Sequence, residues 1–251
     1  KVLNNDCSGI ADIAHALRRF HQALGDSNEL PEYAMRNIRA SLVRRLLTEQ
    51  LDFLKVAKEY VDTRVLEGLI DHTITARPAT GKLGGKTAGV VLAQSVLARE
   101  IPLTPSLAGV RTPKTWALSS GCVIDFIAYN DLEAVHEHKY KPIDQIRKDY
   151  PHIVRLFKGS RFPPEIERGL ILLLDDFGSV PIVVRSSSLL EDRVGAPFSG
   201  KYKSLFLANQ GSRTERLTAL MDAIAEIYAS VFHPDPIEYR REHGLLDFNE
   251  E

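Results

Sequence analysis

The spacing of apolar residues predicts that the first third of the chain is helical. Between Gly9 and Ala23, apolar residues recur every three or four positions, and small polar residues at 25–28 end this segment. Pro31 suits the first turn of a second helix, because a proline there removes no hydrogen bond. From Pro31 to about Ile70 no proline follows, and apolar residues repeat along one side. We therefore expect one long helix over 31–70, within a helical region that covers residues 1–70.

In the rest of the chain, the pattern of apolar residues predicts helices that alternate with short strands. Runs of β-branched and apolar residues favour strands, and apolar residues at helical spacing favour helices. Such an alternation places residues 71–251 in the mixed α/β (α+β) class. Ser119 and Ser120 suit the N-cap of the helix that begins near Val123. The predicted strands are Thr73–Thr75, Trp116–Leu118, Ile182–Val184 and Tyr202–Ala208, and the predicted helices are 91–100, 123–129, 141–157, 164–177 and 213–232.

One stretch, Pro181–Phe206, combines a strand with groups that bind anions. Ile182–Val184 has the composition of a strand that is buried on both faces, and Arg185 follows it directly. An arginine at the end of a buried strand needs a partner, because an unpaired buried charge is costly. The alternative is a surface strand end at which Arg185 pairs with Glu191 or Asp192. Small donors and loose backbone that could approach an anion follow at Ser186, Ser187, Ser188, Gly195, Ser199 and Gly200.

A second candidate for anion binding lies just before the helix predicted over 91–100. Gly84 and Gly85 stand at its start, where backbone N–H groups have no partner within the helix and the helix dipole attracts anions. Lys86 in the first turn is unfavourable for a bare helix N-terminus, so its position makes sense beside a phosphate. The segment is not a P-loop, because Thr80 stands where that motif requires a glycine. The alternative is a plain glycine turn with an exposed lysine.

Both candidates resemble elements of one family. The stretch from Pro181 resembles the signature of the N-terminal nucleotide-binding domain of pyruvate phosphate dikinase and phosphoenolpyruvate synthase. That signature is a V-R-S-S run, an acidic pair, and a small-residue turn that leads into an aromatic strand. Gly84-Gly85-Lys86 is similar to the G-G-K element of the same family and departs from it at Thr87, where a glycine is commoner. The residues that match the signature are Val184-Arg185-Ser186-Ser187, Glu191-Asp192, Phe198-Ser199-Gly200 and Phe206.

The resemblance implies a fold and a nucleotide site. The fold is an ATP-grasp-like domain of mixed sheet and helices over residues 71–251, truncated at its C-terminal end. Lys86 and Arg185 become the two catalytic cations of the site, and we expect them to converge on a common anion pocket. The implied nucleotide-binding residues are Gly84, Gly85, Lys86, Arg185, Ser186, Ser187, Ser188, Glu191, Asp192, Ser199 and Gly200.

The resemblance also implies an activity. In the family, ATP and Mg²⁺ bind together, and phosphate passes to a histidine on a separate domain and then to an acceptor such as pyruvate. The metal ligands and the phosphohistidine domain are expected beyond Glu251, so the chain is expected to be the ATP-binding portion of a longer phosphotransferase. A function of another class stays open: a non-catalytic ATP-sensing or scaffolding module whose helical region at 1–70 binds a partner.

The composition narrows the partners and the location. Lys+Arg 32 against Asp+Glu 33 gives a net charge of -1, so no overall field favours nucleic acid. No apolar run approaches the roughly 20 residues of a membrane span. Cys7 and Cys122 lie far apart and resemble the reduced thiols of a cytoplasmic protein. Lys1 stands where an initiator methionine would be, which indicates a piece of a longer polypeptide.

Two further patterns favour structural interpretations. His136 and His138 are two positions apart and would lie on different faces of a helix, so we expect a solvated helix over 131–141 and no metal site. Asp176-Phe177-Gly178 matches the magnesium motif of protein kinases, but no H-R-D loop precedes it. We interpret it as the end of a helix at Gly178, before Pro181.

Overall fold

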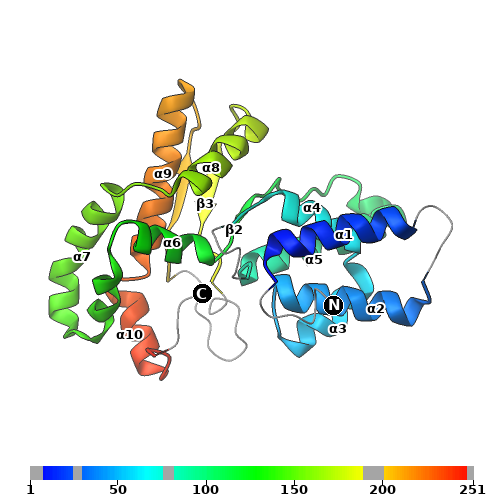
Figure 1. Cartoon of the computed structure of the whole chain (residues 1–251), viewed down its shortest axis with the longest axis horizontal. Helices are drawn as coiled ribbons and strands as arrows, with labels where there is room; N and C mark the ends of the chain where they lie inside the picture. Colours follow the sequence, from blue (N-terminus) through cyan, green and yellow to red (C-terminus); the bar gives the residue numbers. More distant parts are fainter. Residues whose placement is uncertain (1–7, 25–29, 76–81, 189–200, 248–251) are drawn as a thin grey trace. The chain divides into compact units, whose positions relative to one another are not determined.

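The structure is a computed structural model that describes residues 8–24, 30–75, 82–188 and 201–247. The described residues form mostly helices, together with two small two-stranded sheets (Figure 1). The mixed α/β class predicted from the sequence is therefore confirmed. The chain divides into two units, Lys1–Gly121 and Cys122–Glu251, and each is described by itself. The boundary expected near residue 70, between a helical region and a family domain, stays a prediction.

Helices form most of the first unit. The predicted first helix is confirmed as α1, and its buried residues Ile10, Ile13, Ala14 and Leu17 follow the predicted spacing. The single helix expected over 31–70 is wrong, because this segment forms three helices. The helices of this unit are α1 (Ile10–Leu24), α2 (Glu32–Leu46), α3 (Leu51–Tyr60), α4 (Thr63–Asp71), α5 (Gly85–Glu100) and the 3₁₀ helix η2 (Pro105–Leu107).

Side-chain hydrogen bonds explain where the predicted long helix is interrupted. The hydroxyl oxygen of Thr48 accepts a hydrogen bond from the N–H of Gln50 at 3.2 Å, between α2 and α3. Asp62 is the N-cap of α4, and its carboxylate accepts from the N–H of Arg64 at 2.8 Å. Short polar side chains of this kind bind nearby backbone in conformations that compete with the helix. Thr48 and Asp62 therefore separate the helices without a proline or glycine.

A small parallel sheet lies in the same unit. Strand β1 (Thr73–Ile74) pairs with β2 (Ala117–Leu118), with Thr73 opposite Ala117 and Ile74 opposite Leu118. Both strands were predicted and are confirmed. Parallel strands need a crossover connection, and here α5 lies between them in the sequence. The two strands therefore end at the same edge of the sheet.

The core of the first unit is made of the apolar faces of its helices. Leu46 and Leu66 are completely buried, and Ala88 and Val91 bring α5 into the same cluster. Helical stability in proteins depends mainly on such packing of an amphipathic face. The remaining buried members are Ile10, Ile13, Ala14, Leu17, Leu42, Val43, Leu47, Ala57, Val61, Ile70, Leu83 and Ala117.

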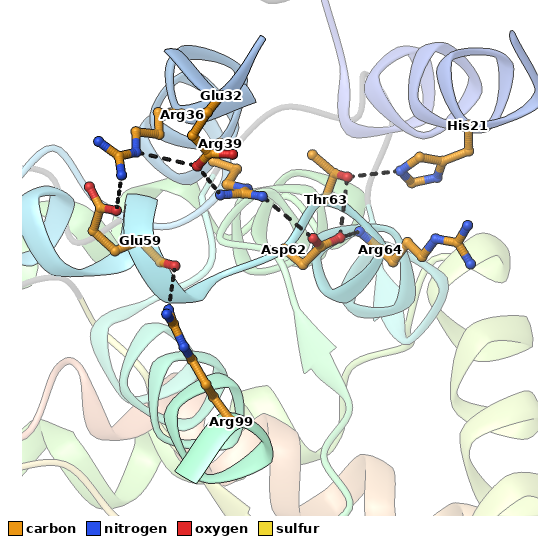
Figure 2. Close-up of polar contacts among 9 residues, drawn as sticks. All are labelled: His21, Glu32, Arg36, Arg39, Glu59, Asp62, Thr63, Arg64 and Arg99. Carbon is orange, nitrogen blue, oxygen red and sulfur yellow. Dashed lines mark hydrogen bonds and ion pairs between the residues drawn. The ribbon is translucent and has the colours of Figure 1, made fainter. Parts of the chain in front are cut away.

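Charged side chains join the helices around this core (Figure 2). Arg36 lies between Glu32, at 3.3 Å, and Glu59, at 3.2 Å, and so connects α2 with α3. Arg39 lies 3.4 Å from Glu32 and 3.8 Å from Asp62, and so connects α2 with the start of α4. These arginines pair with carboxylates, as the mixed charges of the segment indicate.

The second unit places helices around a short antiparallel sheet. Strand β3 (Ile182–Arg185) pairs with β4 (Ser204–Leu207), and both pack against α9 (Arg213–Ser230). Phe126 lies at the centre of an aromatic core, with ring centroids 5.6 Å from Phe157, 4.8 Å from Phe162 and 5.6 Å from Tyr228. The other helices of this unit are α6 (Gly121–Tyr129), η3 (Glu133–Tyr140), α7 (Ile143–Lys158), α8 (Pro164–Phe177) and α10 (Pro234–Glu242).

Two predictions about this unit have different outcomes. Helix α8 ends at the expected place, where Gly178 adopts a positive φ of 62° that suits a glycine at a helix end. The solvated helix expected over 131–141 is instead a 3₁₀ helix in which His138 is only 3% exposed.

None of the described helices has the length and apolar character that crossing a membrane requires.

Candidate functional site

The glycine turn identified in the sequence lies at the N-terminus of α5. Gly84 is the N-cap residue, Gly85 is the first helical residue and Lys86 is the second. No side chain caps this end, and the first turn holds no acidic residue. The first N–H groups of a helix have no carbonyl partner within it, and the helix dipole places partial positive charge there. Together with Lys86, this end of α5 can attract a phosphate group.

Backbone hydrogen bonds fix the turn to two other parts of the unit. The N–H of Leu83 donates to the carbonyl of Leu46 at 2.8 Å, and the Leu83 side chain is 1% exposed. On the other side, the N–H of Lys82 donates to the hydroxyl oxygen of Ser120, and the N–H of Ser120 donates to the carbonyl of Lys82, both at 3.3 Å. The start of α5 is thereby held at the edge where β2 ends. Ligands of α/β proteins commonly bind at the carboxyl ends of parallel strands.

Lys82 has a different role from Lys86. Its ammonium group lies 2.7 Å from a carboxylate oxygen of Glu49. The hydrogen bond and charge of Lys82 hold the pKa of Glu49 below its ordinary value. Lys82 therefore belongs to an ion pair that joins the turn to the segment between α2 and α3, whereas Lys86 stands within the first turn of α5.

Arg185 is the last residue of β3 and lies opposite Ser204 of β4. The expectation that this strand is buried on both faces is wrong: Ile182 is buried, but Val183 is 45% exposed and Arg185 is exposed. Along a strand, successive side chains point to opposite faces, so Val183 and Arg185 share the open face. The sheet packs against α9, and on the face that bears Val183 and Arg185 no element among the described residues covers these two side chains.

The hydroxyls expected beside Arg185 follow the strand directly. Ser186, Ser187 and Ser188 are half-buried and come immediately after β3. The other residues predicted for this part of the site lie outside the described residues. They are Glu191, Asp192, Ser199 and Gly200.

The two predicted cations lie in different units of the chain. Lys86 belongs to the first unit and Arg185 to the second. Their convergence on one anion pocket therefore stays a prediction.

Ser120 was expected only to cap a helix, and its contact with Lys82 was missed. The sequence signal for Ser120 is its position two residues after the end of the predicted strand Trp116–Leu118.

The described residues offer no metal site of their own. No group of three or more histidine, cysteine, aspartate or glutamate side chains within 8–24, 30–75, 82–188 and 201–247 is arranged to hold a metal ion. The Mg²⁺ that the resemblance implies therefore has no ligand set among the described residues, and its binding stays a prediction.

An uncapped glycine turn followed by a lysine, on a mixed α/β scaffold, is typical of domains that bind nucleotides through their phosphates. The chain belongs to the family of the pyruvate phosphate dikinase AMP/ATP-binding domain, whose family model matches residues 80–251. The match begins just before the glycine turn and includes both Lys86 and Arg185. Searches of curated proteins and of solved structures found no match. The family resemblance inferred from the sequence is confirmed, and with it an ATP-binding domain of a phosphotransferase family.

Proposed function

We propose that this chain is the ATP-binding portion of a dikinase-like phosphotransferase, in which Lys86 and Arg185 hold the phosphates. The observation that carries this proposal is the uncapped N-terminus of α5, with Lys86 in its first turn, inside the segment that matches an AMP/ATP-binding domain. Backbone N–H groups and a lysine at a helix start bind phosphate oxygens through both hydrogen bonds and charge.

The two cations have complementary tasks in this proposal. Lys86 is a compact charge on a flexible stem, which can follow a phosphate as charge shifts during transfer. Arg185 presents a planar fork that can bind two oxygens at once. Ser186, Ser187 and Ser188 would donate hydrogen bonds to phosphate oxygens, and the other residues predicted for the nucleotide site, Glu191, Asp192, Ser199 and Gly200, lie outside the described residues.

The reaction we propose is a phosphate transfer in two stages. In the first stage, a histidine nitrogen on a separate domain of the same polypeptide attacks a phosphorus atom of ATP, and the rest of the nucleotide leaves as that P–O bond breaks. In the second stage, the acceptor, such as pyruvate that has lost a methyl proton, attacks the phosphohistidine through its enolate oxygen; the P–N bond breaks, the histidine is released and phosphoenolpyruvate forms. Mg²⁺ bound with ATP would neutralise part of the phosphate charge. The task of Lys86 and Arg185 is to orient the phosphates and to stabilise the negative charge of the transition state, which is usually a large contribution to catalysis.

Calorimetric titration of this chain with ATP tests the binding part of the proposal. We expect Lys86→Ala and Arg185→Ala each to weaken ATP binding by about tenfold or more, as the loss of one hydrogen bond to a charged group predicts. Lys148→Ala and Arg168→Ala remove exposed cations from α7 and α8 and should leave the affinity unchanged. ATP affinities that are equal in all five proteins would contradict the proposal.

Transfer needs its own test, in the full-length protein. Incubation with ATP labelled in its phosphates should produce an acid-labile phosphohistidine, and this product should be lost in Arg185→Ala. Binding of ATP without any phosphohistidine would instead favour the sensing or scaffolding module. Addition of pyruvate to the labelled protein then tests the acceptor, because the label should move to phosphoenolpyruvate.

A further inference from the structure

The open face of the β3–β4 sheet carries an apolar half and a polar half. Val183 lies opposite Phe206, and Arg185 lies opposite Ser204. These four side chains share one face, because alternate residues of a strand point the same way. All four are exposed, whereas Ile182 on the opposite face is 8% exposed. The register therefore places an apolar pair directly beside a cation and a hydroxyl.

Phe206 is the unusual member of this face. It is 85% exposed, and its strand neighbour Val183 is 45% exposed. A large aromatic side chain that stands open on a sheet loses the stabilisation that burial would give it. An exposed apolar patch with a polar rim commonly marks a binding surface. Because Phe206 is not packed into the core by the residues that the structure describes, its position makes it a candidate for ligand binding.

The spacing of the two halves limits the chemistry of that ligand. Residues two apart on a strand are separated by about 7 Å, and the Arg185 side chain extends the polar half further. The ligand must join a flat apolar group to an anionic group across such a distance. A nucleotide fits, because its base can stack on an aromatic ring while its phosphates meet a guanidinium and a hydroxyl. A strand of another protein would instead use the backbone at the edge of the sheet.

We propose that Phe206, supported by Val183, is the surface on which the base of the bound nucleotide stacks. Phe206 then determines the preference for a nucleotide over inorganic polyphosphate, while Arg185 contributes to the binding of both. This inference rests on the proposed ATP-binding function. It adds a specificity-determining residue that contacts the base.

Titration with two ligands separates the base from the phosphates. Inorganic triphosphate carries the anionic part of ATP without the base, so the pair isolates the contribution of stacking. We expect Phe206→Ala to weaken ATP binding by about tenfold and to change triphosphate binding less than twofold. Arg185→Ala should weaken both ligands. Leu172→Ala removes an apolar side chain that is 61% exposed on α8 and should change neither.

A fluorescent variant gives a second, direct measurement. In Phe206→Trp, the indole should stack on the base, so ATP and adenosine should quench its emission and triphosphate should not. The wild-type chain, whose single tryptophan is Trp116, supplies the background signal. Because Phe206 is exposed, both substitutions should leave the thermal midpoint unchanged within about 2 °C.

The results of these titrations decide whether the nucleotide base stacks on Phe206. Full ATP affinity in Phe206→Ala would overturn the stacking surface and leave the ATP-binding function in place. Equal weakening of ATP and triphosphate would also overturn it, because the base would not be the group affected. Loss of self-association in Phe206→Ala, with ATP affinity intact, would assign the face to a second copy of the chain. Failure of the wild-type chain to bind either ligand would overturn the proposed function, and the stacking surface with it.

Discussion

Lys82 and Ser120 exchange two hydrogen bonds across a separation of 38 residues. The N–H of Lys82 donates to the Ser120 hydroxyl oxygen, and the N–H of Ser120 donates to the carbonyl of Lys82. Lys82 comes two residues before the N-cap of α5, and Ser120 comes two residues after the end of β2. This exchange fixes the start of α5 relative to the parallel sheet, and a phosphate site made of backbone N–H groups depends on such positioning.

Ser120→Ala should loosen the glycine turn while leaving Lys86 in place. The substitution removes the acceptor of the Lys82 N–H, so we expect the free energy of unfolding to fall by about 1 kcal/mol. We also expect a several-fold loss of ATP affinity, because the N–H groups of α5 would be held less firmly. Urea denaturation and calorimetric titration measure the two effects. Ser106→Ala, on an exposed position of η2, is the matched control, and an unchanged ATP affinity in Ser120→Ala would contradict the positioning role.

Asp62→Ala should destabilise the helical unit through the start of α4. Asp62 accepts a hydrogen bond from the N–H of Arg64 at 2.8 Å and lies 3.8 Å from Arg39 (Figure 2). Loss of an N-cap aspartate costs about 1 kcal/mol, which should lower the thermal midpoint by about 2–4 °C in a protein of this size. Scanning calorimetry measures the change.

Two control variants separate the cap from the charge of Asp62. Asp62→Asn keeps an N-cap acceptor and removes the charge opposite Arg39, so it should recover most of the lost stability. Asp52→Ala removes an exposed carboxylate from the first turn of α3, where it pairs with Lys55, and should have little effect. Equal destabilisation by Asp62→Asn and Asp62→Ala would show that the ion pair, and not the cap, is the main contribution.

The sequence predicted local elements better than the contacts between them. Amphipathic spacing predicted α1, α8 and α9, because each needs only its own periodicity. The breaks at Thr48 and Asp62 were missed, because such residues also occur inside helices and only the hydrogen bond distinguishes the two cases. The sequence also did not predict that one face of β3 is open, because an apolar run does not reveal what covers each side.

In the candidate site, too, the sequence predicted the local features and missed the contacts between distant segments. Gly84, Gly85 and Lys86 were placed correctly at a helix start, since glycines before an apolar helical segment are a local signal. The contact of Lys82 with Ser120 joins segments 38 residues apart, and no local pattern indicates it. The exposure of Phe206 depends on the absence of a packing partner among the described residues, which a sequence does not state.

Arg216→Met should destabilise the second unit more than a surface arginine does. Arg216 of α9 donates to the carbonyl of Leu174 at 2.9 Å and to that of Gly178, and so adds a further donor at the C-terminal end of α8. It also donates to the side-chain oxygen of Asn209 at 2.9 Å, and Asn209 is only 7% exposed. The carbonyls of Leu174 and Gly178 keep the hydrogen bonds that they accept from the Gly178 N–H and the Asn209 amide, so the main loss is the donor to the side-chain oxygen of the buried Asn209. Such a loss costs about 1–3 kcal/mol, and urea denaturation should measure it.

The control for Arg216 lies one turn earlier on the same helix. Arg213 pairs with Asp175, and both side chains are more than half exposed. Exposed ion pairs contribute little to stability, so Arg213→Met should change the free energy of unfolding by less than about 0.5 kcal/mol. If the two substitutions cost the same, neither the side-chain oxygen of Asn209 nor the end of α8 depends on Arg216.

His138 makes the stability of the second unit depend on pH. Its side chain is 3% exposed, its Nδ1 lies 3.9 Å from the Asp149 carboxylate, and its buried Nε2 has no partner among the described residues. Burial lowers the pKa of His138, the nearby charge of Lys141 lowers it further, and Asp149 opposes the shift. The folded chain therefore binds a proton at His138 less readily than the unfolded chain does.

His138→Gln should remove a loss of stability that occurs in mild acid. Because the folded pKa is lower than the ordinary value of 6.5, the unfolded chain binds more protons below about pH 6.5, and the free energy of unfolding falls as the pH decreases. One proton corresponds to a slope of at most about 1.4 kcal/mol per pH unit. Urea denaturation between pH 5 and 8 should show this slope in the wild type and in His152→Gln, since His152 is exposed. In His138→Gln the slope should be smaller, and the contribution of His233, whose pKa burial also lowers, should remain; an unchanged slope would mean that His138 is not the titrating group.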